Sequence, residues 1–239
     1  MDNPQRYGWE HLTYIAVVIV VAFLVLFFAK KYAKTEKAKT IVVKCLAGVL
    51  LIFIVTNRWS IVFKTDPPEW NWLLPNSLCG LTSAVLALSV LLGKKDNPAL
   101  HFVWLIALLG GTIVTFYPDF LSQNPSFMYL PTISGLLHHS FSAIVAVSLF
   151  VFDYIHLSYK KWYCILLGFA CYLAVGAFFV SVMGYGDALH MKDPILENTP
   201  LTIWVVAPMY MAVYGLIILV VELVRKKKEI ENKQIEEET

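Results

Sequence analysis

The stretch Leu74-Pro75-Asn76-Ser77-Leu78-Cys79-Gly80 opens an apolar run that ends near Leu92. We expect Pro75 to start a helix here, because its missing N–H costs nothing at the first helical position. Cys79 would then lie about one turn inside the helix, among small and polar neighbours. The depth of this thiol is the reference against which the other reactive side chains are compared.

Apolar runs recur along the whole chain. Of its 239 residues, 58% are hydrophobic and only 15% are charged, whereas a soluble domain carries about a quarter charged residues. Runs of about 20 apolar residues can cross a hydrocarbon core of ~30 Å. The sequence therefore predicts an all-α, polytopic integral membrane bundle of seven transmembrane helices in a single transmembrane domain, residues 1–239. The expected spans lie near residues 12–29, 41–63, 73–92, 100–116, 132–152, 163–183 and 201–224.

Most of the 19 Lys and Arg residues fall on one side of such a bundle. These residues are Lys30, Lys31, Lys34, Lys37, Lys39, Lys44, Lys94, Lys95, Lys160, Lys161, Arg225, Lys226, Lys227, Lys228 and Lys233. Because cytoplasmic connections carry the excess of basic residues, we expect the N-terminus outside and a charged cytoplasmic tail, residues 225–239. The expected location is a plasma membrane, and the excess of lysine over arginine indicates an AT-rich bacterial genome.

Polar side chains from several spans reach one layer below the outer surface. Ionisable groups within spans are costly and are candidates for function. At ~1.5 Å per residue, Arg58, Cys79 and the pair His138–His139 lie at similar distances from the outer ends of their helices. Asp119, Glu10 and His11 lie at the outer ends of two more spans. This distribution predicts a cavity near the outer leaflet.

A thiol and an imidazole at one depth can form a nucleophile–base pair, in which histidine takes the proton and the thiolate attacks a carbonyl carbon. Arg58 can hold a phosphate, and Asp119 can orient a histidine or pair with Arg58. Each of these residues also has a structural alternative. Cys79 can be a packing residue, one histidine can hydrogen-bond to a neighbouring helix, and Arg58 can extend its side chain to the membrane interface. The four cysteines lie within apolar runs, which predicts free thiols. There is no H-E-x-x-H or C-x-x-C spacing, and we expect no metal, no cofactor and no nucleic-acid partner.

Several short motifs occur in an order that resembles a known family. They are Glu10-His11-Leu12, the LP..LC pattern from Leu74 to Cys79, Gly110-Gly111 followed by Pro118-Asp119, and His139. In this order they resemble the YwaF-like family of bacterial integral membrane proteins. That family is related to a eukaryotic transmembrane acyltransferase acting on ether phospholipids. The resemblance extends from about Glu10 to the seventh span.

The resemblance implies a cysteine–histidine acyl-transfer site, with Cys79 as nucleophile and His139 as general base. His138 is the fallback base, and it joins Arg58, Asp119, Glu10 and His11 as the expected substrate-binding residues. The position two before the cysteine is often charged or histidine in relatives, whereas here it is Ser77. The expected function is a lipid acyltransferase or acyl hydrolase, with membrane phospholipids or lysophospholipids as partners.

The alternatives are a transporter or ligand-binding protein, in which Pro208 and Gly215 let the last span bend, and a helical scaffold. The loop 184–200 is expected to be either a lid or a linker.

Overall fold

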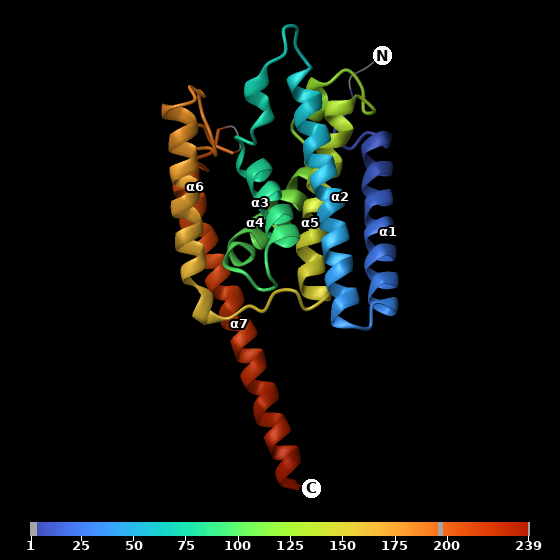
Figure 1. Ribbon diagram of the computed structural model, residues 1–239, viewed down its shortest axis with the longest axis vertical. Helices are drawn as coiled ribbons and strands as arrows, with labels where there is room; N and C mark the ends of the chain where they lie inside the picture. The colour runs from blue at the N-terminus through green and yellow to red at the C-terminus, as the bar shows by residue number, and fades with distance from the viewer. Residues whose placement is uncertain (1–3, 196–197, 239) are drawn as a thin grey trace. The chain divides into compact units, whose positions relative to one another are not determined.

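The computed structural model describes residues 4–195 and 198–238, and the side chains as far as residue 227. The described chain contains helices and no strands. The helices are α1 (Trp9–Tyr32), α2 (Glu36–Val62), η1 (Trp70–Leu73), α3 (Leu78–Leu92), α4 (Pro98–Phe116), η2 (Leu121–Gln123), α5 (Leu130–Val151), η3 (Tyr159–Lys161), α6 (Tyr163–Ser181) and α7 (Ile203–Glu238). Figure 1 shows the long helices in chain order from blue to red. The all-α prediction is confirmed.

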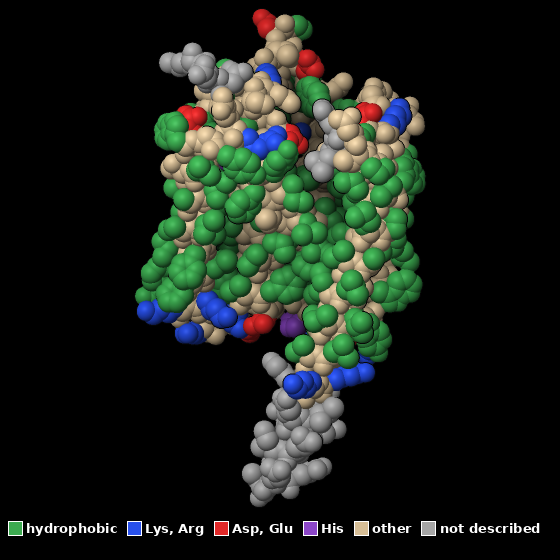
Figure 2. Space-filling view, turned by 180° about the vertical axis from the view of Figure 1, so that it is seen from behind, with side chains coloured by type: hydrophobic (Ala, Val, Ile, Leu, Met, Phe, Trp, Pro, Cys, Tyr) green, Lys and Arg blue, Asp and Glu red, His purple; other side chains and the backbone are tan. Residues whose placement is uncertain are grey.

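Six helices in the described ranges are long and apolar enough to cross a membrane. One further apolar helix, α3, has only 15 residues. It is about 22 Å long at ~1.5 Å per residue, which is shorter than a ~30 Å hydrocarbon core. Hydrophobic side chains cover the sides of the helices in Figure 2, and Lys and Arg side chains gather near helix ends. The protein is therefore a multi-pass membrane protein, with six helices in its described part that are long and apolar enough to cross a membrane.

The start of α3 differs from the prediction that Pro75 begins the helix. The helix begins at Leu78, and the Ser77 hydroxyl caps it by accepting a hydrogen bond from the Gly80 N–H at 3.1 Å. Serine is a preferred N-cap because its oxygen satisfies a backbone donor that has no partner within the helix. Cys79 is consequently the second residue of α3 rather than a residue one turn inside it.

The chain divides into two compact units, residues 1–155 and 156–239. In the first unit, α2 and α4 both pack along α5, and α3 packs against α2 and α4. Two further helix contacts are polar: Ser83 of α3 donates a hydrogen bond to Ser142 of α5, and Tyr14 of α1 pairs with Ser140 of α5. Such bonds satisfy hydroxyl groups where no water is available.

The second unit comprises η3, α6 and α7. Phe169 of α6 and Tyr210 of α7 meet edge to face, with their ring centroids 5.4 Å apart. The connection between these helices includes the predicted loop 184–200, of which residues 196–197 lie outside the described residues. Ala188 and Leu189 in this loop are buried, and the Trp204 indole N–H donates to the Met191 carbonyl at 3.0 Å. The described part of the loop is therefore held to the start of α7.

Candidate functional site

A cavity of about 580 Å³ opens within the first unit. Its wall is formed by α2, the α2–α3 connection, the α4–α5 connection and α5. The polar or charged side chains in its lining are Asn57, Arg58, Lys64, Thr65, Glu69, Asn76, Ser77, Gln123, Asn124, His138 and His139. The two basic side chains outnumber the one carboxylate, Glu69, and together with two imidazoles and several amides they suit a ligand with a negatively charged head.

The α2 wall presents Asn57 and Arg58. Asn57 is buried, and its amide donates to the Pro131 carbonyl and to the Ser134 hydroxyl of α5, both at 3.2 Å. The same side chain accepts a hydrogen bond from Arg58 Nη2 at 3.1 Å. Asn57 therefore ties α2 to α5 and also fixes the guanidinium.

The Arg58 guanidinium lies beside the first turn of α3. Its Nη2 atom is 3.9 Å from the position that a Cβ atom on Gly80 would occupy. The turn that carries Cys79 and Gly80 thus lies next to a fixed positive charge. In a low-dielectric site such a charge attracts anions more strongly than it would in water.

The α5 wall presents two adjacent histidines. The rings of His138 and His139 lie 3.9 Å apart between centroids and are tilted by 32°. Within the described chain, neither ring nitrogen of His138 has a hydrogen-bond partner, and neither does Nδ1 of His139, although all three atoms are buried. Buried polar atoms without partners are uncommon and costly, so these imidazoles are suited to meet a bound molecule.

Cys79 approaches α4 closely. Its Sγ atom is 3.0 Å from the position that a Cβ atom on Gly110 would occupy. A Cβ on the next residue, Gly111, would lie 2.5 Å from the carbonyl oxygen of His139. The two glycines of α4 therefore allow close approach of two helices: α3, with Cys79, lies against Gly110, and α5, with His139, lies against Gly111. Cys79 is a free thiol of intermediate exposure.

The remaining predicted residues lie near the outer ends of α1 and α4. Asp119 forms an ion pair with Arg6 at 2.7 Å, and the Arg6 guanidinium stacks over the Tyr117 ring at 3.5 Å. These contacts give Asp119 a partner other than Arg58 or a histidine, the two partners expected from the sequence. Glu10 is partly exposed at the start of α1.

His11 is fully buried and has a protein partner at each ring nitrogen. Nε2 donates to the Thr115 carbonyl at 3.0 Å, and Nδ1 accepts from the Tyr7 N–H at 3.1 Å. This pattern defines a neutral imidazole with its proton on Nε2. His11 therefore connects α1 to the end of α4 through its hydrogen bond to Thr115.

The structure thus brings Arg58, His138 and His139 to one cavity and places Cys79 beside it. Glu10, His11 and Asp119 are not among the described residues that line this cavity. The sequence reading missed Asn57, Asn76, Ser77, Gln123 and Asn124. Asn57 could have been predicted as a site residue, because it is a polar residue within an expected span and next to Arg58.

Comparison with known proteins places the chain in a family. No curated protein and no solved structure matches the sequence. A family model described as the TMEM164 family matches residues 6–224, which is most of the chain and includes both units. The match includes all the helices that form the cavity. The chain belongs to the TMEM164 family of transmembrane proteins.

Proposed function

We propose that the protein transfers or hydrolyses the acyl chain of a phospholipid, with Cys79 as nucleophile and His139 as general base. One observation carries the proposal: the imidazoles of His138 and His139 line a cavity together with Arg58, whose guanidinium lies beside the α3 turn that contains Cys79. Nucleophilic acyl transfer requires a nucleophile that an adjacent base activates, and Cys79 and His139 are the residues to which we assign these two roles.

In the first step the imidazole of His139 takes the Sγ proton, and the thiolate attacks the ester carbonyl carbon of the lipid. The carbonyl carbon–oxygen ester bond breaks, the acyl group stays on Sγ as a thioester, and the imidazolium returns the proton to the departing alkoxide. In the second step a lysolipid hydroxyl, or water, gives its proton to His139 and attacks the thioester. The carbon–sulfur bond then breaks, and the thiolate recovers its proton.

The neighbouring groups have supporting roles. Arg58, held by Asn57, binds the lipid phosphate, and His138 contacts the same head group. The N–H groups of Leu78 and Cys79 are among the first donors of α3 and have no partner within the helix. Because these N–H groups belong to the same turn of α3 as the proposed nucleophile, we assign them to stabilisation of the oxyanion that would form on the acyl carbon.

A second function is favoured by one specific observation. Among the described residues that line the cavity are Asn76 and Ser77, but Cys79 is absent from the lining. A protein that captures a lipid or another amphipathic anion without reacting with it would need the cavity, Arg58 and the imidazoles, but no thiol. In that case Cys79 packs against Gly110.

Lipid turnover by purified protein separates the two functions. The acyltransferase predicts that Cys79→Ala abolishes transfer of a labelled acyl chain between phospholipid and lysophospholipid, and that Cys45→Ala leaves it unchanged. Binding of the lipid should survive in Cys79→Ala. Equal turnover by wild type and Cys79→Ala would contradict acyl transfer through Cys79. Loss of binding with Arg58→Gln alone, in the absence of any turnover, would establish the ligand-binding function.

We further infer that the protein is of the YwaF type and resides in the plasma membrane of a bacterium. In this proposal α3 completes a set of seven transmembrane helices in one domain, residues 1–239. The N-terminus lies outside, and the tail of residues 225–239 lies in the cytoplasm. The excess of basic residues at the end of α1 and just after the apolar part of α7 supports this orientation.

A further inference from the structure

A second cavity, of about 390 Å³, lies in the first unit at the other end of α2. It is formed by the end of α1, the start of α2 and the end of α5. Three lysines and one aspartate, namely Lys30, Lys34, Lys39 and Asp153, line it. Their formal charges leave the cavity with a net positive lining.

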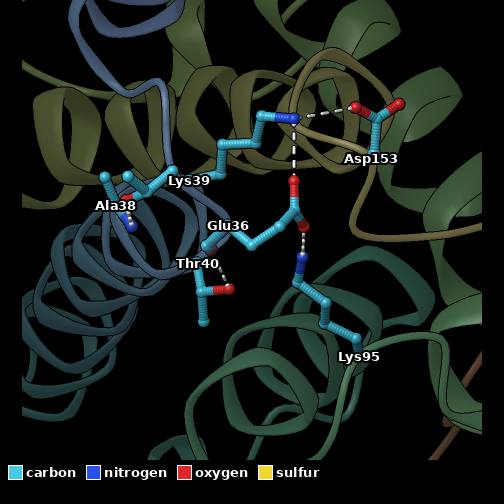
Figure 3. Close-up of polar contacts among 7 residues, drawn as sticks. Glu36, Ala38, Lys39, Thr40, Lys95 and Asp153 are labelled. Atoms are coloured by element: carbon cyan, nitrogen blue, oxygen red, sulfur yellow. Dashed lines mark hydrogen bonds and ion pairs between the residues drawn. The ribbon is translucent and has the colours of Figure 1, made fainter.

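Lys39 is held in this cavity by a charge cluster that Figure 3 shows. Its ammonium lies 2.9 Å from Glu36 Oε1 and 3.2 Å from Asp153 Oδ2, while Lys95 contacts the other Glu36 oxygen at 2.7 Å. These groups are exposed to solvent, which weakens each of these ion pairs. The two cations and two carboxylates of this cluster balance, so the cluster orients Lys39 and the net positive charge of the cavity comes from Lys30 and Lys34.

The other two lysines of the cavity are available to a ligand. Lys30 in the last turn of α1 and Lys34 just after it are both exposed, and neither has an ion pair in the described part of the chain. The adjacent wall is apolar and includes Phe150, Val151 and Phe152 at the end of α5. Lysines beside an apolar wall, at the level where spanning helices end, match a phosphate with an attached hydrocarbon chain.

This cavity is separate from the one that contains Arg58. Lys39 and Arg58 lie on the same helix, roughly 28 Å apart along its axis at ~1.5 Å per residue. That distance is close to the thickness of a hydrocarbon core. A lipid head group at one cavity therefore belongs to a different molecule from a head group at the other.

We propose that Lys30, Lys34 and Lys39 bind the phosphate group of an anionic membrane lipid. The lipid is a bound ligand of this end of the bundle and undergoes no reaction there. The phosphate contacts the three ammonium groups, and the first acyl carbons lie against the end of α5. This site does not depend on acyl transfer at Cys79.

The test is a thermal-unfolding titration of the full chain in detergent with phosphatidylglycerol, phosphatidylcholine or inorganic phosphate. Phosphatidylglycerol should raise the unfolding midpoint of the wild type, and phosphatidylcholine should not. The double variant Lys30→Gln, Lys34→Gln should lose about 30-fold in apparent affinity, because each lysine near a lipid phosphate contributes about fivefold. The matched control is Lys37→Gln, which removes an exposed lysine outside the cavity and should behave as wild type.

A second variant tests the sign of the electrostatic effect. Asp153→Asn removes a carboxylate from the cavity and should tighten binding of phosphatidylglycerol, while weaker binding would contradict the site. Stabilisation by inorganic phosphate that equals the effect of the lipid and disappears in the double variant would assign the site to a free phosphate. An equal response of wild type and the double variant to both anions would overturn the proposal.

Discussion

The Sγ atom of Cys79 lies 3.0 Å from the position that a Cβ atom on Gly110 would occupy. The thiol in the first turn of α3 is thus accommodated by the absence of a side chain on α4. The adjacent Gly111 accommodates the α5 backbone at His139 in the same way. Access to Cys79, and its distance from the imidazoles, therefore depend on how closely three helices pack at one glycine pair.

Gly110→Ala should displace the thiol. A Cβ at 3.0 Å from Sγ is tighter than an ordinary contact, and the Cys79 side chain must move or the first turn of α3 must shift. A displacement of about 1 Å can cost about a hundredfold in rate, so acyl transfer should fall by about that factor. Turnover of a labelled lipid measures the effect. Gly48→Ala is the control, since a Cβ there meets nothing within 4 Å; equal losses in both variants would contradict the prediction.

Gly111→Ala should lower the stability of the whole fold and not merely displace the Cys79 thiol. The new Cβ would lie 2.5 Å from the His139 carbonyl oxygen and 2.9 Å from the Ala143 nitrogen, both backbone atoms that cannot rotate away. Overpacking of this kind costs about 1–3 kcal/mol. The thermal-unfolding midpoint in detergent should fall below that of Gly48→Ala. An unchanged midpoint would mean that α4 and α5 are not in close contact at this position.

Asn57→Leu should weaken the junction of α2 with α5 and release Arg58. The substitution removes two donated hydrogen bonds and the acceptor for Arg58, leaving the Pro131 carbonyl without this donor. A buried polar group left unpaired costs about 1–3 kcal/mol, so the unfolding midpoint should fall and lipid binding should weaken. Asn76→Leu removes an amide from the same cavity and should leave the midpoint near that of wild type. A larger loss with Asn76→Leu would contradict the assignment.

His11→Ala should lower stability and leave the chemistry of the cavity intact. The variant loses a hydrogen bond to the Thr115 carbonyl and one from the Tyr7 N–H, both in a fully buried position. We expect a loss of about 1–3 kcal/mol, measured as a lower unfolding midpoint, with the affinity for lipid unchanged. Glu10→Gln alters the preceding residue and should change neither quantity. A loss of lipid affinity at unchanged stability would instead give His11 the substrate-binding role that the sequence suggested.

The helices were predictable because apolar run length determines where a chain can span a membrane. The expected spans 100–116 and 132–152 agree with α4 and α5 to within two residues at each end. The start of α3 was predicted wrongly because the helix-forming signal of Pro75 competes with the capping hydroxyl of Ser77, and the cap prevails. Composition could not decide between these two signals.

Depth along the helices also predicted that Arg58 would share a cavity with His138 and His139. It could not predict which side of a helix faces which neighbour. The contacts of His11 with Thr115 and of Asp119 with Arg6 arise from tertiary packing between residues more than 100 positions apart. The position of Cys79 against Gly110 also arises from tertiary packing. Both residues belong to motifs that were singled out in the sequence, but their contact could not be predicted from those motifs.

The most direct test of the account is labelling of the four cysteines in intact membranes by a lipid-like electrophile added from outside. Acyl transfer predicts fast, selective labelling of Cys79 that falls sharply in His139→Ala and persists in His11→Ala. Slow labelling of Cys45, Cys164 and Cys171 provides the internal reference. Equal, slow labelling of all four thiols, unaffected by His139→Ala, would show that Cys79 is a packing residue and would contradict an activated cysteine–histidine pair.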